Sequence, residues 1–68
     1  MNKGEVKLFD NKRGFGFIKW SGDDLFVHYT DIEADDDYKK LFAGQKVEFE
    51  IKQAPRGPQA IRVKIIED

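Results

Sequence analysis

Polar and apolar residues alternate strictly in one stretch of this chain, from Lys46 to Lys52. Lysine or glutamate occupies every second position, and Val47, Phe49 and Ile51 stand between them. A β-strand points successive side chains to opposite faces, so this order places the apolar residues on one face and the charges on the other. The stretch is therefore interpreted as a half-buried strand, and it predicts a core built from β-sheet.

Most of the remaining chain is typical of short strands separated by turns, because no segment keeps a sustained helical period. Polar or Pro/Gly-rich clusters at residues 10–12, 21–24 and 54–58 mark the turns. The longer connection after the third strand is expected to contain a short helical turn at residues 38–42, with Leu41 and Phe42 packed onto the core. The five strands are expected at residues 3–10, 14–20, 25–29, 46–53 and 59–66.

Three strands, one longer connection and a final hairpin close most economically as a barrel. Closure removes the exposed edges that a sheet of this size would otherwise present. A chain of 68 residues has room for one such core, so residues 1–68 are expected to form one domain. The predicted fold class is all-β, a five-stranded antiparallel barrel with a short helical turn between strands 3 and 4.

The apolar residues that alternation points inward suffice to fill a small barrel. They are Val6, Ile18, Leu25, Val27, Val47, Phe49, Ile51, Ile61, Val63 and Ile65. Phe15, Phe17, Phe26 and His28 are left on one outer face of the second and third strands. Lys7, Arg13 and Lys19 surround this face, and aromatic rings among cations suit the stacking of single-stranded bases.

Composition excludes several classes of site. With no cysteine and one histidine, the sequence predicts no metal and no cofactor. The net charge of −1 is unlike that of proteins that bind duplex DNA through bulk positive charge. No apolar run has the length of a signal peptide or a membrane span, so we expect a cytoplasmic protein with no membrane partner. We also expect a monomer.

Four blocks of the sequence closely resemble the bacterial cold-shock proteins. They are GEVKLF at 4–9, RGFGFI at 13–18, LFVHY at 25–29 and RGPQA at 56–60, in the family's order and close to its spacing. The resemblance implies an OB-fold and, as partners, single-stranded RNA and single-stranded DNA bound with low sequence specificity. It also implies an RNA chaperone that takes part in a stress response.

The second and third blocks are similar to the two RNA-binding motifs of that family. The resemblance adds Lys7, Phe9, Tyr29, Tyr38 and Arg56 as contacts, with Asp24 as a hydrogen-bond partner for a base edge. Together, alternation and resemblance predict a nucleic-acid-binding set of Lys7, Phe9, Arg13, Phe15, Phe17, Asp24, Phe26, His28, Tyr29, Tyr38 and Arg56.

Two features depart from the family pattern. Leu8 stands where members commonly carry tryptophan, which removes one stacking surface. The aspartates at 35–37 are a heavier acidic run than the family pattern, and beside Tyr38 they oppose the binding of phosphate. Tyr29 and Tyr38 replace phenylalanines and keep the ring.

Other interpretations explain less of the sequence. A barrel that binds an extended peptide in the same aromatic groove is the main alternative, although the clustered cations disfavour it. A triad of Ser21, His28 and Asp31 has no nucleophile elbow or oxyanion hole around it, so neither enzyme activity nor a small-molecule substrate is expected. The RNA-recognition-motif fold needs two amphipathic helices that the sequence does not contain. A purely architectural barrel leaves the outer aromatic residues unexplained.

Overall fold

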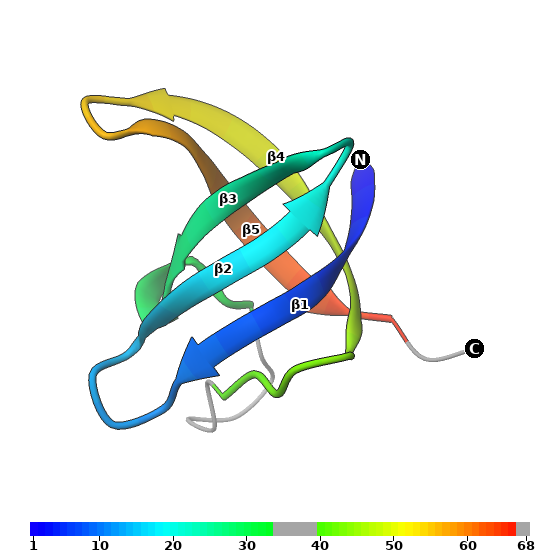
Figure 1. The fold of residues 1–68 in the computed structure, drawn as a ribbon, viewed down its shortest axis with the longest axis vertical. Helices are drawn as coiled ribbons and strands as arrows, with labels where there is room; N and C mark the ends of the chain where they lie inside the picture. The colour runs from blue at the N-terminus through cyan, green and yellow to red at the C-terminus, as the bar shows by residue number, and fades with distance from the viewer. Residues whose placement is uncertain (34–39, 67–68) are drawn as a thin grey trace.

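Five β-strands form a closed barrel in the computed structural model, which describes residues 1–33 and 40–66 (Figure 1). The predicted all-β, five-stranded barrel is confirmed, and every strand lies within two residues of its predicted bounds. The 3-10 helix η1 spans Tyr29–Asp31 and follows the third strand. The strands are β1 Asn2–Asp10, β2 Phe15–Trp20, β3 Asp23–His28, β4 Lys46–Ala54 and β5 Gly57–Ile65.

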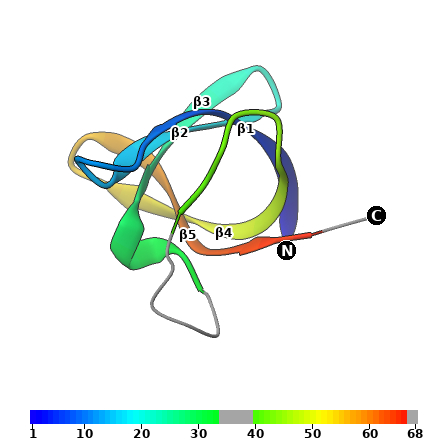
Figure 2. The same cartoon turned by 90° about the horizontal axis from the view of Figure 1, so that it is seen from below.

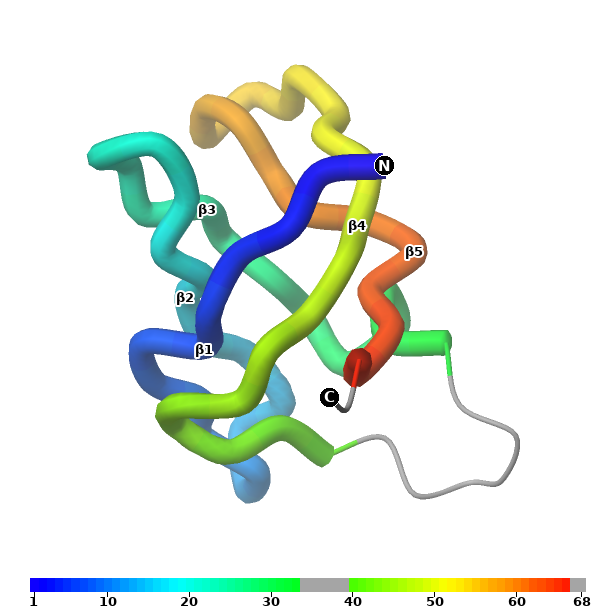
Figure 3. The backbone as a smooth tube through the Cα atoms, turned by 90° about the vertical axis from the view of Figure 1, so that its right-hand side faces the viewer, coloured from blue at the N-terminus to red at the C-terminus, as the bar shows by residue number. Residues whose placement is uncertain are grey.

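The strand order around the barrel is β1-β2-β3-β5-β4. β1, β2 and β3 form the predicted meander and β4 pairs with β5 as the predicted hairpin. β1 also pairs with β4, and the two strands run side by side in Figure 3. A short parallel contact between Phe26 of β3 and Gln59 of β5 completes the ring, which Figure 2 shows end-on.

In the described part of the connection between β3 and β4, η1 lies directly after β3. His28 caps η1: its Nδ1 accepts from the Thr30 N–H at 3.4 Å, and the Asp31 carboxylate accepts from the His28 N–H at 3.3 Å. Residues 40–42 of the predicted turn are not helical, and residues 38 and 39 lie outside the described part of the chain. Local capping therefore forms a helical turn directly after β3, which composition did not indicate.

The segment that leads into β4 crosses the lower opening of the barrel (Figure 2). The Gly44 N–H donates to the Val6 carbonyl at 2.8 Å, and the Val6 N–H donates to the Gln45 carbonyl at 2.9 Å. Leu41 is fully buried, as expected, whereas the expectation that Phe42 packs onto the core is wrong, because its side chain is 57% exposed.

The core contains most of the residues that alternation pointed inward. Ile61 and Ile65 are exceptions: Ile61 is partly exposed and Ile65 is exposed. β5 carries one residue more than β4 between two paired positions, and Arg62 in that bulge has a φ of 52°. The extra residue breaks the alternation, so Ala60 and Val63 both point inward. The buried apolar residues are Val6, Ile18, Leu25, Val27, Ile32, Leu41, Val47, Phe49, Ala60 and Val63.

The β2–β3 turn contains two residues with positive φ, Ser21 at 49° and Gly22 at 81°. Trp20 pairs with Asp23 across this turn, so it is a two-residue hairpin turn with both central residues left-handed. Asparagine is favoured at the first of these positions, where most side chains are strained. We expect Ser21→Asn to stabilise the fold by up to about 1 kcal/mol, raising the melting temperature by a few degrees.

Thermal unfolding followed by circular dichroism measures this shift. Gly22→Ala is the matched control and should lower the melting temperature, because alanine is disfavoured at positive φ. An unchanged or lower melting temperature in Ser21→Asn would contradict the assignment of this turn.

Candidate nucleic-acid interface

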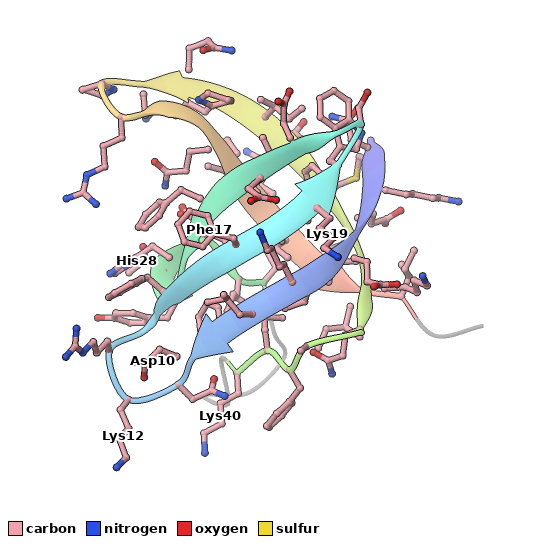
Figure 4. The ribbon with its side chains drawn as sticks, viewed as in Figure 1. Asp10, Lys12, Phe17, Lys19, His28 and Lys40 are labelled. Carbon is pink, nitrogen blue, oxygen red and sulfur yellow. The ribbon has the colours of Figure 1, made fainter. Side chains whose placement is uncertain are left out.

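An aromatic platform, defined as Phe15, Phe17, Phe26 and His28, lies on the outer face of β2 and β3. Strand pairing sets Phe15 opposite His28 and Phe17 opposite Phe26. The Phe26 ring centroid is 6.1 Å from those of both Phe15 and Phe17, stacked with the former and edge-on to the latter. The rings are partly exposed, and Figure 4 labels Phe17 and His28 on these strands. The structure thus brings the four predicted rings together.

Gly16, which separates the two phenylalanines of β2, occupies a position where no side chain fits. Gly16 is buried and pairs with Phe9 of β1. A Cβ at this position would collide with the Leu8 carbonyl oxygen and lie 2.6 Å from the Phe9 Cα. The close approach of β1 therefore requires glycine on the inner side of β2, while Phe15 and Phe17 occupy the outer side.

A bulge in β1 changes which of its residues face the platform. Val6 pairs with Ile18 and Leu8 with Phe17, so Lys7 is the extra residue and both Lys7 and Leu8 are exposed. Leu8, 47% exposed, extends the apolar surface beside Phe17. Phe9 follows on the inner side and is partly buried, packed against the core.

Lys7 and Asp24, two predicted contacts, form an ion pair across β2. The Lys7 Nζ lies 2.8 Å from Asp24 Oδ2, and both side chains are partly exposed. Such an exposed pair contributes only about 0–1 kcal/mol, so a ligand can separate it at little cost. The pair holds one cation and one hydrogen-bond acceptor near the Phe17–Phe26 end of the platform.

Arg56 approaches the platform from the β4–β5 turn. Its guanidinium carbon lies 5.4 Å from the centre of the Phe26 ring. This cation–π contact joins a predicted phosphate-binding side chain to the central ring. The predicted grouping of Arg56 with the aromatic residues is therefore present in the structure.

His28 and Tyr29 extend the aromatic surface toward η1. Their ring centroids are 4.6 Å apart, and Tyr29 is 46% exposed, although simple alternation would have turned it inward. His28 Nδ1 lies 3.4 Å from the Thr30 N and 2.9 Å from the Thr30 Oγ1, so this nitrogen faces η1. His28 thus offers a ligand its ring and its other ring nitrogen, Nε2.

Asp10 orders the turn that carries Arg13. The Lys12 and Arg13 N–H groups donate to Asp10 Oδ1 at 3.0 and 3.1 Å. These hydrogen bonds, first that of Arg13 and then that of Lys12, hold the pKa of the Asp10 carboxyl below its usual value. The carboxylate also lies 3.8 Å from the Arg13 Nε, while the Arg13 side chain stays exposed two residues before Phe15.

One predicted contact falls outside the described part of the chain, and the triad rejected from the sequence is not assembled within it. Tyr38 lies outside the described residues, as do the aspartates at 35–37. Ser21 precedes β3 whereas His28 ends it, so the length of this strand separates the serine from the histidine. Within residues 1–33 and 40–66, no group of three or more acidic, histidine or cysteine side chains is arranged to hold a metal.

Sequence reasoning missed Gln59, which lies on the same outer face. It pairs with Phe26, and its Nε2 donates to Asp31 Oδ2 at 2.6 Å. The parallel contact of β3 and β5 brings these residues together, and no local pattern indicates it.

Among the described helices, none is long and apolar enough to cross a membrane.

Comparison with known proteins identifies the family. Residues 2–66 match the family model described as the 'Cold-shock' DNA-binding domain. Cold shock protein CspD of Bacillus subtilis is 56% identical over 64 residues, which cover 93% of this chain and 96% of that protein. A cold shock-like protein of Thermotoga maritima is 52% identical over 66 residues, which cover 96% of this chain and 98% of that protein.

A solved structure agrees with these relatives. Drosophila Unr CSD456 matches 97% of this chain with a TM-score of 0.76 and 28% sequence identity. The matched region is 26% of the Unr chain, so this chain corresponds to about a quarter of that structure. The family match, the relatives and the barrel together show that the chain belongs to the family of cold-shock DNA-binding domains.

Proposed function

We propose that this protein binds single-stranded RNA and DNA with low sequence specificity by stacking bases on the aromatic platform. The observation that carries the proposal is the contact of Phe26 with both Phe15 and Phe17 on an outer face, with the Arg56 guanidinium over the same ring. Every base has a π-face, so such a surface accepts any sequence. Duplexes bury these faces, so single strands are preferred.

The charged residues around the platform have separate roles in this proposal. Lys7, Arg13 and Arg56 meet phosphates, while Asp24 and the His28 Nε2 offer hydrogen-bonding groups to base edges. The polar partners are few and partly exposed, so they bias base choice weakly. Phe9 and Tyr38 complete the proposed set, with Phe9 contributing mainly through its packing under β2.

The proposed biological activity is that of an RNA chaperone. A protein that binds the unpaired state shifts a hairpin toward that state by mass action, without ATP. Each stacked base contributes about 1–3 kcal/mol, so a few contacts are enough to compete with weak base pairing. The relatives are named for cold shock, which supports a role in a stress response in the cytoplasm.

Fluorescence anisotropy tests the proposal with a short labelled oligothymidine and a duplex of the same length, at low and moderate salt. We expect the single strand to bind far more tightly, with a shallow salt dependence, because stacking supplies most of the free energy. Equal binding of both probes that salt abolishes would contradict stacking. If neither probe binds, the proposal fails and peptide libraries become the relevant ligands.

A further inference from the structure

A second group of cationic and aromatic side chains lies at the end of the barrel where the β1–β2 turn meets the segment leading into β4. The Asn11 side chain joins the two: its Nδ2 donates to the Leu41 carbonyl at 3.0 Å, and its Oδ1 accepts from the Leu41 N–H at 3.3 Å. Lys12 follows Asn11, while Lys40 and Phe42 flank Leu41. We call Lys12, Lys40 and Phe42 the basal patch, and Figure 4 shows its two lysines extending from this end of the barrel.

Phe42 is exposed on an ordered backbone. Its N–H donates to Gln45 Oε1 at 2.8 Å, and its carbonyl accepts from the Gln45 N–H at 3.2 Å. The preceding Leu41 is fully buried, yet 57% of the Phe42 side chain remains exposed. The turn therefore holds an exposed aromatic ring, which is a surface on which a base can stack.

Charge and position indicate which ligand fits. Two lysines and an exposed aromatic ring on the two segments that Asn11 joins suit an anionic, aromatic partner, which is the chemistry of a nucleotide. Lys12 is followed by Arg13, which stands two residues before Phe15 at the start of the aromatic platform. The basal patch is therefore continuous, through the β1–β2 turn, with the surface proposed to hold the strand.

We propose that a single strand lying on the aromatic platform continues past Arg13 onto the basal patch, where Phe42 stacks one further base and Lys12 and Lys40 meet its phosphates. This inference rests on the proposed function. The aspartates at 35–37 precede Lys40 in the sequence and oppose phosphate, so stacking on Phe42 supplies the larger share of the gain.

The test is the gain in affinity between an oligothymidine of about six nucleotides and one of about ten, lengths that one OB fold covers. Anisotropy titrations compare the wild type with Phe42→Ala and with Ile65→Ala, whose side chain is also exposed but lies on β5. A longer strand can also bind at more positions along the same surface, and this statistical effect raises the affinity equally in all three proteins. We expect the gain in Phe42→Ala to be smaller than the wild-type gain by about five-fold or more, and that in Ile65→Ala to match the wild type.

The outcomes separate this inference from the proposed function. If the wild type binds neither oligothymidine, the proposed function fails and this inference fails with it. If both bind, but the wild-type gain equals that of Phe42→Ala, the basal patch takes no nucleotide and this inference alone is overturned. In the double variant Lys12→Gln, Lys40→Gln, the gain should depend less steeply on salt than in the control double variant Lys46→Gln, Lys64→Gln. Equal salt slopes in the two double variants would overturn the phosphate contacts.

Discussion

Phe26→Leu is expected to weaken the binding of single-stranded oligothymidine by about 1–3 kcal/mol, or about 5- to 150-fold, in a protein that stays folded. Phe26 is the central ring, in contact with Phe15, Phe17 and the Arg56 guanidinium. Leucine keeps much of the apolar volume that packs on the strands, but it has no π-face on which a base can stack. Anisotropy gives the affinity, and circular dichroism reports the fold.

Phe26→Tyr is the matched control, because it keeps the ring at the same position. It should bind like the wild type and show the same salt dependence. A folded Phe26→Leu protein with wild-type affinity would show that burial of apolar surface, and not stacking, holds the ligand. The peptide-binding alternative would then gain support, since an extended peptide needs apolar contact but no stacking.

Phe49→Ala is expected to cost about 3–5 kcal/mol of folding free energy, enough to unfold most of the protein at room temperature. Phe49 has the largest of the fully buried side chains in the described part of the chain, and its ring lies on the inner face of β4. A domain below about 70 residues without disulfides rarely has more than about 3–5 kcal/mol of stability in total. Urea unfolding followed by circular dichroism measures the change.

Phe42→Ala controls for the loss of a phenylalanine, because its exposed side chain contributes little to packing; its folding free energy should stay within about 0.5 kcal/mol of the wild type. Phe49→Leu provides a folded variant, with an expected loss below about 1.5 kcal/mol. A Phe49→Ala protein that unfolds at nearly the wild-type urea concentration would show that the barrel does not depend on this core.

The strands and the face that carries the rings could be predicted because both depend on local order. Side chains in a strand alternate with a period of two whatever the strand pairs with, so Phe15, Phe17, Phe26 and His28 fall on one side. Turn residues mark where each strand ends, which is why the strand bounds were nearly right. The family resemblance added residues outside the strands, such as Arg56, that alternation does not reach.

Bulges and contacts between distant strands could not be predicted in this way. Lys7 and Arg62 are extra residues only relative to the strands that pair with β1 and β5, so the bulges cannot be seen in either strand alone. These bulges determine which way Leu8, Ile61 and Ile65 point. The capping of η1 by His28 likewise moved Tyr29 out of the strand.

The sequence by itself determined five strands, one barrel and an outer aromatic face, because each of these follows from the order of neighbouring residues. Only the tertiary structure decided that Arg56 lies over Phe26, that Lys7 pairs with Asp24 and that Gln59 bonds to Asp31. These contacts join residues distant in the chain. Those of Arg56 and Gln59 depend on how β5 closes against β3, and that of Lys7 depends on how β1 and β3 pair with the two sides of β2. Alternation assigns a side chain to a face, whereas closure of the barrel selects its partner on that face.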